Sequence, residues 1–125
     1  MFDSNRSTVK TLLKPQEITA TATGPAVDTQ RLDGVGKLIL SAVAASAGTD
    51  PTLNVKLTEC ATSGGTYTDV TGAVFDEVTD AADSLQQIAI QLGGLKRYVK
   101  AVATVGGTVT PTFVLTVLLD GLQEA

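Results

Sequence analysis

Four stretches in the second half of the sequence have the residue pattern of β-strands. Residues 53–58 and 87–92 alternate strictly between apolar and polar side chains, and residues 98–105 and 111–119 continue the series. Successive side chains of a strand point to opposite faces of a sheet, so a period of two predicts strands with one buried face. Gly- and Asp-rich turns separate the stretches. Short strands at this spacing predict an all-β fold, as a β-sandwich or a barrel.

The remaining chain adds further strand candidates, which bring the total to about eight. Residues 18–23 alternate, residues 67–70 and 74–78 form two short candidates, and residues 37–45 form an apolar run in which Lys37 and Ser41 are the only polar residues. That last run fits a helix or a strand buried on both faces, and we favour the strand because glycines bracket it. The predicted core comprises Leu38, Leu40, Val55, Leu57, Ile88, Ile90, Val99, Val105, Phe113, Leu115 and Val117.

Three segments are predicted to reverse the chain between neighbouring strands. Residues 47–51 have the composition of a hairpin-type loop, and Gly93-Gly94 and residues 106–108 are short enough to join consecutive strands.

The N-terminal residues differ in composition from the rest. Residues 1–14 are polar and rich in Thr and Ser, with few apolar anchors, so we expect an extended N-terminal arm over residues 1–24 and a β-sandwich domain over residues 25–125. Such arms are often loose until a partner orders them. Deleting residues 1–14 is then expected to leave the β body folded.

The chain length of 125 residues and its 43% apolar content fit one domain with a sizeable core. The longest apolar run is too short to span a bilayer, and the first residues lack the pattern of a signal peptide. We therefore expect the product to stay in the cytoplasm where it is made. Cys60 is the only cysteine and has no partner for an internal disulfide, which agrees with a reducing compartment.

The charge is distributed unevenly. The net charge of −4 argues weakly against nucleic acid as a partner. Residues 50–83 carry one lysine against seven carboxylates, a net of −6, whereas residues 1–37 carry five basic and four acidic residues, a net of +1. This distribution suits head-to-tail contact between copies, and it equally suits an ordinary solvated surface.

The sequence offers little for catalysis, metal binding or cofactor binding. It contains no histidine, which excludes the usual serine triad and leaves Cys60 without a base. Asp76, Glu77, Asp80 and Asp83 do not have the spacing of a calcium loop, so turn and cap roles are predicted for the aspartates. We expect no catalytic residue, no metal, no cofactor and no enzymatic activity.

One short segment combines basic and aromatic residues. Lys96, Tyr98 and Lys100 share one face of a strand, and Arg97 points to the other. A tyrosine between lysines is able to stack on a base, but a single ring is too few for an RNA-binding sheet. A ring covered by lysine stems, or a tyrosine in a protein interface, fits the pattern better.

Three segments together resemble small head proteins of tailed bacteriophages. They are residues 29–38, which lead into a buried strand, residues 53–60 with 65–70, and residues 94–101 before the last strand. The resemblance covers about residues 25–119. Several such proteins are decoration or cement proteins, which bind the expanded capsid and stabilise it. The resemblance implies a jelly-roll-like β-sandwich, a homotrimer, the major capsid protein as partner, and a place on the capsid surface of the virion.

On this basis the expected function is a non-enzymatic virion structural protein that decorates a phage capsid. Alternatives are a head–tail connector or tail-tube subunit and, from another class, a carbohydrate-binding β-sandwich module. No nucleic acid or membrane partner is expected. The residues expected at the capsid or subunit interface are Phe2, Val9, Leu12, Leu13, Lys96, Arg97 and Tyr98.

Overall fold

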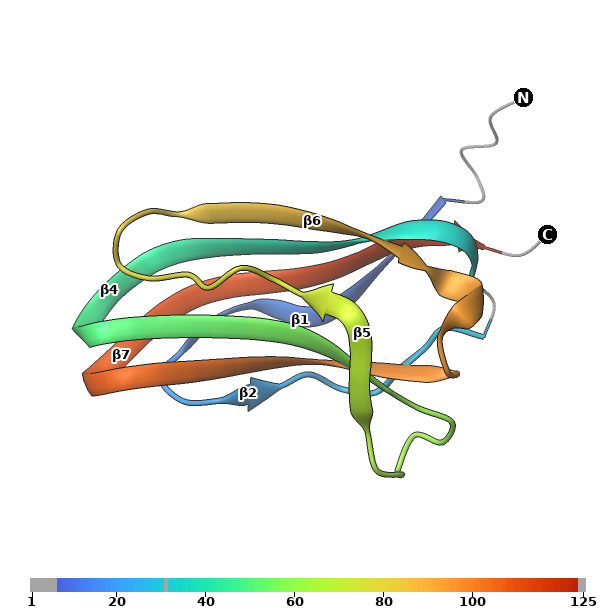
Figure 1. The fold of residues 1–125 in the computed structure, drawn as a ribbon, viewed down its shortest axis with the longest axis horizontal. Helices are drawn as coiled ribbons and strands as arrows, with labels where there is room; N and C mark the ends of the chain where they lie inside the picture. The colour runs from blue at the N-terminus through green and yellow to red at the C-terminus, as the bar shows by residue number, and fades with distance from the viewer. Residues whose placement is uncertain (1–6, 31, 124–125) are drawn as a thin grey trace.

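The computed structural model describes residues 7–30 and 32–123 and shows an all-β fold (Figure 1). One short 3-10 turn interrupts a series of antiparallel strands. In chain order the elements are β1 (Ser7–Ile18), β2 (Ala22–Thr23), β3 (Val27–Asp28), β4 (Leu32–Cys60), β5 (Thr68–Val74), β6 (Ser84–Gln91), the 3-10 turn η2 (Leu92–Gly94) and β7 (Tyr98–Gln123).

Two long strands, β4 and β7, form the frame of the molecule. Their pairing runs from Leu32 opposite Gln123 to Cys60 opposite Tyr98. Both strands bend sharply between the two halves of this ladder, which divides the sheet into two layers. In the first layer, β6 and β1 flank the first half of β4 and the second half of β7. In the second layer, β5 pairs with the second half of β4, and β2 and β3 pair with the first half of β7. The sandwich is therefore one sheet folded over on itself.

The sheet bends over on itself at a corner, where the backbone of several residues adopts left-handed conformations. Gly48 and Gly107 have φ angles of 112° and 108°, and Asp50, Val109 and Thr110 also have positive φ. The β4–β7 register shifts three times between Val43 and Thr52, as it does at β-bulges. The predicted hairpin at residues 47–51 and the predicted join at residues 106–108 are therefore wrong. Residues that permit a reversal also permit two paired strands to bend together.

The predicted hairpin at Gly93-Gly94 is also wrong. β6 pairs with the first half of β4, with Leu38 opposite Ile88. The strand that follows pairs with the second half of β4, with Val55 opposite Ala103. The 3-10 turn η2 therefore leads the chain from one layer to the other. The all-β sandwich is confirmed, and the jelly-roll connectivity stays a prediction.

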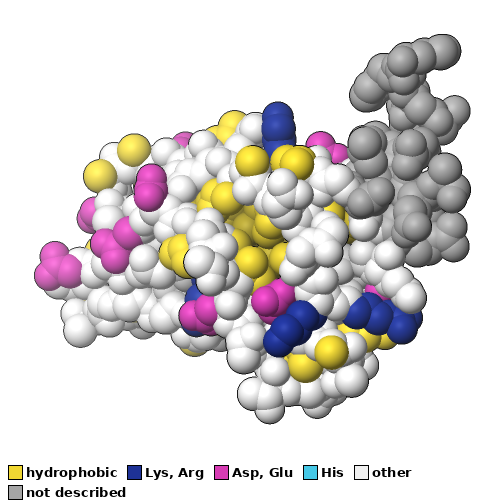
Figure 2. All heavy atoms as spheres, turned by 45° about the vertical axis from the view of Figure 1, so that its right-hand side comes forward, with side chains coloured by type: hydrophobic (Ala, Val, Ile, Leu, Met, Phe, Trp, Pro, Cys, Tyr) yellow, Lys and Arg dark blue, Asp and Glu magenta, His cyan; other side chains and the backbone are white. Residues whose placement is uncertain are grey.

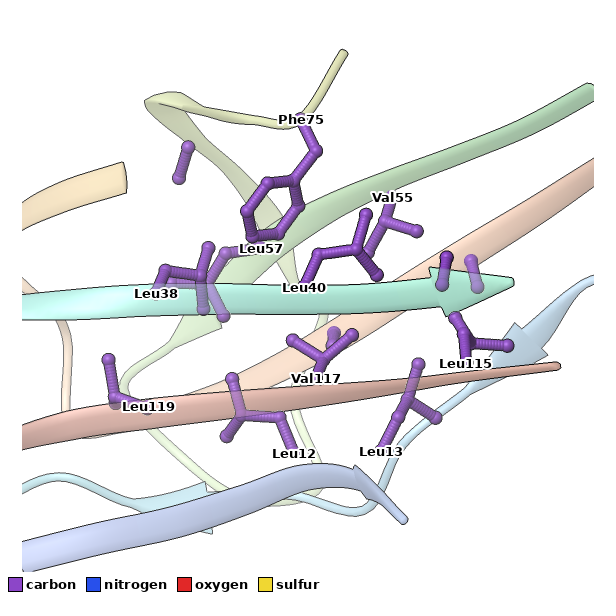
Figure 3. Close-up of a cluster of buried hydrophobic side chains, with 14 of the residues drawn as sticks. Leu12, Leu13, Leu38, Leu40, Val55, Leu57, Phe75, Leu115, Val117 and Leu119 are labelled. Atoms are coloured by element: carbon purple, nitrogen blue, oxygen red, sulfur yellow. The ribbon is translucent and has the colours of Figure 1, made fainter. Parts of the chain in front are cut away.

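The core lies between the two layers and is aliphatic (Figure 3). Nine of the eleven predicted core residues are buried, and Ile88 and Val105 are partly buried against them. The prediction of a strand over residues 37–45 is confirmed, since this run lies inside β4. Figure 3 also shows side chains that the pattern did not select, namely Leu12, Leu13, Phe75 and Leu119.

The first described residues belong to the sheet. β1 pairs with β7 from Ser7–Leu122 to Ile18–Phe113, and a bulge between Thr11 and Leu13 lets two consecutive leucines face inward. Leu12 is 0% exposed and Leu13 is 3% exposed. Residues 7–18 are thus a strand of the sandwich, which corrects the expectation of a loose arm there. The domain boundary between residues 24 and 25 stays a prediction.

Candidate interaction surfaces

Two of the four acidic residues singled out in the sequence hydrogen-bond a backbone amide or a side chain of the neighbouring strand. Asp83 accepts a hydrogen bond from the Ala44 amide at 2.8 Å, and Glu77 accepts one from Asn54 Nδ2 at 3.1 Å. Within residues 7–30 and 32–123, no group of three or more His, Cys, Asp or Glu side chains is placed to hold a metal ion. In the same part of the chain, no helix has the length and apolar character needed to cross a membrane.

Cys60 lies at the end of β4 and is nearly buried. The backbone amide of Thr62 hydrogen-bonds the sulfur and lowers the pKa of the thiol, and the Thr62 hydroxyl lies 3.9 Å from Sγ. A Cβ at Gly65 would come within 2.5 Å of the sulfur, so the loop after β4 packs tightly over it. The structure therefore places the thiol under a loop and away from solvent.

The segment Lys96–Tyr98 is held by contacts within the chain. The Arg97 guanidinium hydrogen-bonds both carboxylate oxygens of Asp28, with Nη2 3.0 Å from Oδ2, and its Cζ lies 5.1 Å from the centre of the Tyr98 ring. These hydrogen bonds lower the pKa of Asp28 and raise that of Arg97. The Lys96 amide donates to Glu59 Oε1 at 2.9 Å. The segment therefore ties β3, β4 and β7 together at one end of the sandwich.

The outer face of the second layer, here called the charged face, is rich in polar contacts. Lys56 forms a 2.8 Å ion pair with Asp69. The ammonium of Lys100 lies 4.5 Å from the centre of the Tyr67 ring, and the Tyr67 hydroxyl donates to Ser63 O at 2.9 Å. Because its charges are paired with one another and remain partly solvated, this face is suited to contact with water.

The outer face of the first layer, here called the apolar face, has the opposite character. Five of the seven large hydrophobic side chains that are exposed in the described residues belong to it, which marks it as a surface for contact with another molecule. Thr, Ser, Gln and Ala fill most of the remaining positions, and the charged residues Lys37, Asp120 and Glu17 also lie on this face. The apolar side chains are Val9, Val35, Ile39, Val43, Leu85, Val114 and Leu118.

Cross-strand register makes the middle of the apolar face continuous, and the paired residues Lys37 and Asp120 separate it from Val35. One row runs from Gln87 through Ile39 and Leu118 to Thr11, and Val43 and Val114 are direct neighbours beyond it. Four strands about 4.8 Å apart, each about 27 Å long over eight residue steps, give a flat area on the order of 500 Å². Specific interfaces cover about 800 Å² per partner, so this face alone supports a modest contact.

A groove opens between the two layers on the side where β5 and β6 form the sheet edges, here called the edge groove. Figure 2 shows a hollow with a hydrophobic floor on this side of the molecule. Its volume is about 440 Å³. The apolar side chains that line it are Val70, Ala73, Ile88, Ile90 and Leu95, and Glu59 lies at its rim.

The structure brings together only part of the predicted interface. Val9 lies on the apolar face with 58% exposure. Leu12 and Leu13 are buried in this chain's own core and offer no surface, so their assignment to an interface is not retained. Lys96, Arg97 and Tyr98 lie at the far end of the other layer with partners of their own, and Phe2 lies outside the described residues.

The sequence pattern missed most of the apolar face. Val35, Val43, Leu85 and Val114 were not singled out. The available signal was the run at residues 37–45, which has apolar residues at both odd-numbered and even-numbered positions and therefore on both faces of a strand. We interpreted that run as a strand buried on both faces, whereas the structure leaves one of its faces open.

Two solved structures with a similar fold come from a virus. A chain of infectious bursal disease virus, Gx strain, matches with a TM-score of 0.59 and 10% identity over 92% of this chain and 31% of that chain. A chain of the Gt strain matches with a TM-score of 0.51 and 11% identity over 98% of this chain and 39% of that chain. This protein therefore spans about a third of the length of those virus chains.

At these identities the likeness shows the fold alone, which is a viral capsid-like β fold. No protein-family model matches the sequence, and no curated protein matches it either.

Proposed function

We propose that this protein is a non-enzymatic virion structural protein that binds the outer surface of a tailed-phage capsid and stabilises it, as decoration or cement proteins do. The viral capsid-like fold supports a structural role. The resemblance of residues 25–119 to small phage head proteins supports the narrower role. On this proposal the partners are the major capsid protein and further copies of the chain in a trimer.

The difference between the two outer faces is the observation that carries the proposal. A protein that coats a particle needs one face that is desolvated when it docks and one face that remains hydrated. The apolar face presents Val35, Val43, Leu85 and Val114, while the charged face presents paired ions. This asymmetry matches a subunit that lies flat on a surface.

The size of the apolar face fits binding in many copies. Its area, on the order of 500 Å², is below that of a standard interface, so one copy docks weakly. Linked copies on a repeating lattice gain affinity through effective concentration, without any new contact. A trimer would therefore bind an assembled capsid strongly and isolated capsid subunits poorly. A head–tail connector or tail-tube subunit would also need one apolar face for docking and one hydrated face. Ring symmetry in electron micrographs would distinguish it from a trimer.

The experiment compares two charge-matched double variants for binding to capsids. The gene would be expressed with the major capsid gene beside it, and particles would be sedimented through a sucrose cushion. Val43→Lys with Val114→Lys places two lysines on directly paired residues of the apolar face. Asn54→Lys with Thr104→Lys does the same on paired, exposed residues of the charged face.

We expect the wild-type protein and the charged-face variant to sediment with particles. We expect the apolar-face variant to stay in the supernatant although it keeps its β-type circular dichroism. Equal sedimentation of both variants would show that the apolar face is not the docking surface. Absence of the wild-type protein from the particles would refute the capsid role.

A further inference from the structure

Strand β6 leaves one edge of the first layer open and carries none of the usual protections. It pairs only with β4 in the part of the chain that the structure describes, and its eight residues pair without a register shift. The segment Ser84–Gln91 contains no charge, no proline and no glycine. Natural sheet edges are usually protected by such residues or by bulges, because free N–H and C=O groups attract another strand. This edge is open to strand addition.

The other outer strands are protected in these ways. β1 contains Pro15, two lysines and two register shifts. β5 has a register shift against β4, and Gly72 within it has a φ of 81°. β2 and β3 have two residues each. Among these outer strands, β6 therefore combines the longest regular pairing with the least protection.

The edge groove beside β6 provides a place for the side chains of an added strand. Ile88 and Ile90 project from β6 toward the core side, and Val70 and Ala73 face them from the β5 side. At one end, Gln86 closes the groove by a pair of hydrogen bonds with the backbone of Asp76, at 2.8 and 3.0 Å. An added strand would place alternate side chains on this apolar floor.

The charge around the groove defines the partner further. Glu59 is the one charged residue among those that line the groove. The chain from residue 57 to residue 95, which holds every lining residue, carries six carboxylates and no lysine or arginine, and Lys56 and Lys96 flank it. One of the six, Asp69, is neutralised by Lys56. The remainder favour a segment with positive charge.

We propose that the free edge of β6 and the edge groove bind an extended segment of another protein by strand addition. The segment has small or branched apolar residues at alternate positions and Lys or Arg at its ends. About six residues, roughly 20 Å, match the length of the edge. This inference does not depend on the capsid role, because it concerns a different surface from the apolar face.

The test uses a synthetic peptide with acetylated and amidated ends, Lys-Val-Thr-Val-Thr-Val-Lys, and its counterpart with Glu in place of each Lys. Binding to the ¹⁵N-labelled full chain would be followed by amide chemical shifts and hydrogen exchange. Two variants carry the same added charge on opposite faces of β6. Ile88→Lys changes the groove, and Leu85→Lys changes the apolar face. Val70→Lys serves as a second groove variant if Ile88→Lys does not fold.

We expect the lysine peptide to shift and protect β6 amides and the glutamate peptide to bind at least about tenfold more weakly. We expect the groove variant to lose about tenfold in affinity and Leu85→Lys to bind like the wild type. Equal binding of both peptides would overturn the charge argument. Wild-type affinity in the groove variant, shifts confined to the apolar face, or self-association through β6 without peptide would overturn the proposal.

Discussion

Replacing Leu12 with alanine tests whether β1 is part of the folded body. The side chain is 0% exposed and packs with Leu119 and Val117 in the core shown in Figure 3. Truncating a fully buried leucine removes its transfer free energy and leaves a cavity, at a cost of about 3–5 kcal/mol. A domain of this size is stable by only about 5–15 kcal/mol, so the variant is expected to lose a large share of its stability.

Urea denaturation followed by circular dichroism measures this loss. With a slope of about 1.5 kcal/mol per molar urea, a cost of about 3 kcal/mol lowers the midpoint by about 2 M. The control is Val9→Ala on the same strand, where the side chain is 58% exposed and the expected cost is below about 0.5 kcal/mol. If Leu12→Ala unfolds at the same urea concentration as the wild type, residues 7–18 are an arm and the packing of β1 described above is wrong.

Three further predictions concern the corner between β4 and β7, the ion pair of Asp28 with Arg97, and the loop over Cys60. Gly107→Ala should cost about 1–3 kcal/mol in urea denaturation, because φ is 108° and the added Cβ would lie 2.7 Å from Asp50 O. Gly64→Ala, with open space around it and an ordinary φ, should not be destabilising. The lowered pKa of Asp28 means that its ion pair with Arg97 stabilises the fold above the usual carboxyl pKa, and that this contribution is lost as pH falls through the lowered value. Asp28→Asn should therefore reduce thermal stability at pH 7 and make no difference below that value, and an equal loss at both pH values would contradict this. Tyr67→Phe removes one hydrogen bond to the loop over Cys60, and the thiol should then react faster with a maleimide.

The sequence by itself determined the fold class and most of the core. Alternation in residues 53–58 and 87–92 fixes which side chains face inward, because the period of a strand is a local property of the backbone. For that reason Val55, Leu57 and Ile90 were assigned to the core correctly.

The candidate surfaces were less accessible to sequence analysis. Exposure of Val43 and Leu85 depends on whether another layer covers that side of the sheet, which no local pattern records. Burial of Leu12 beside Leu13 depends on a bulge, which breaks the period of two that the prediction relied on. The edge groove depends on two edges, β5 and β6, that lie in different layers.

Only the tertiary structure decided which strands are neighbours. Glycine-containing segments at residues 47–51 and 106–110 are able to reverse a chain or to bend two paired strands, and they bend β4 and β7 here. Gly93-Gly94 was expected to join neighbours, and η2 instead leads the chain between layers. A turn residue sets the permitted backbone angles, whereas strand pairing is set by the burial of side chains distant in sequence, such as Leu38 against Leu119.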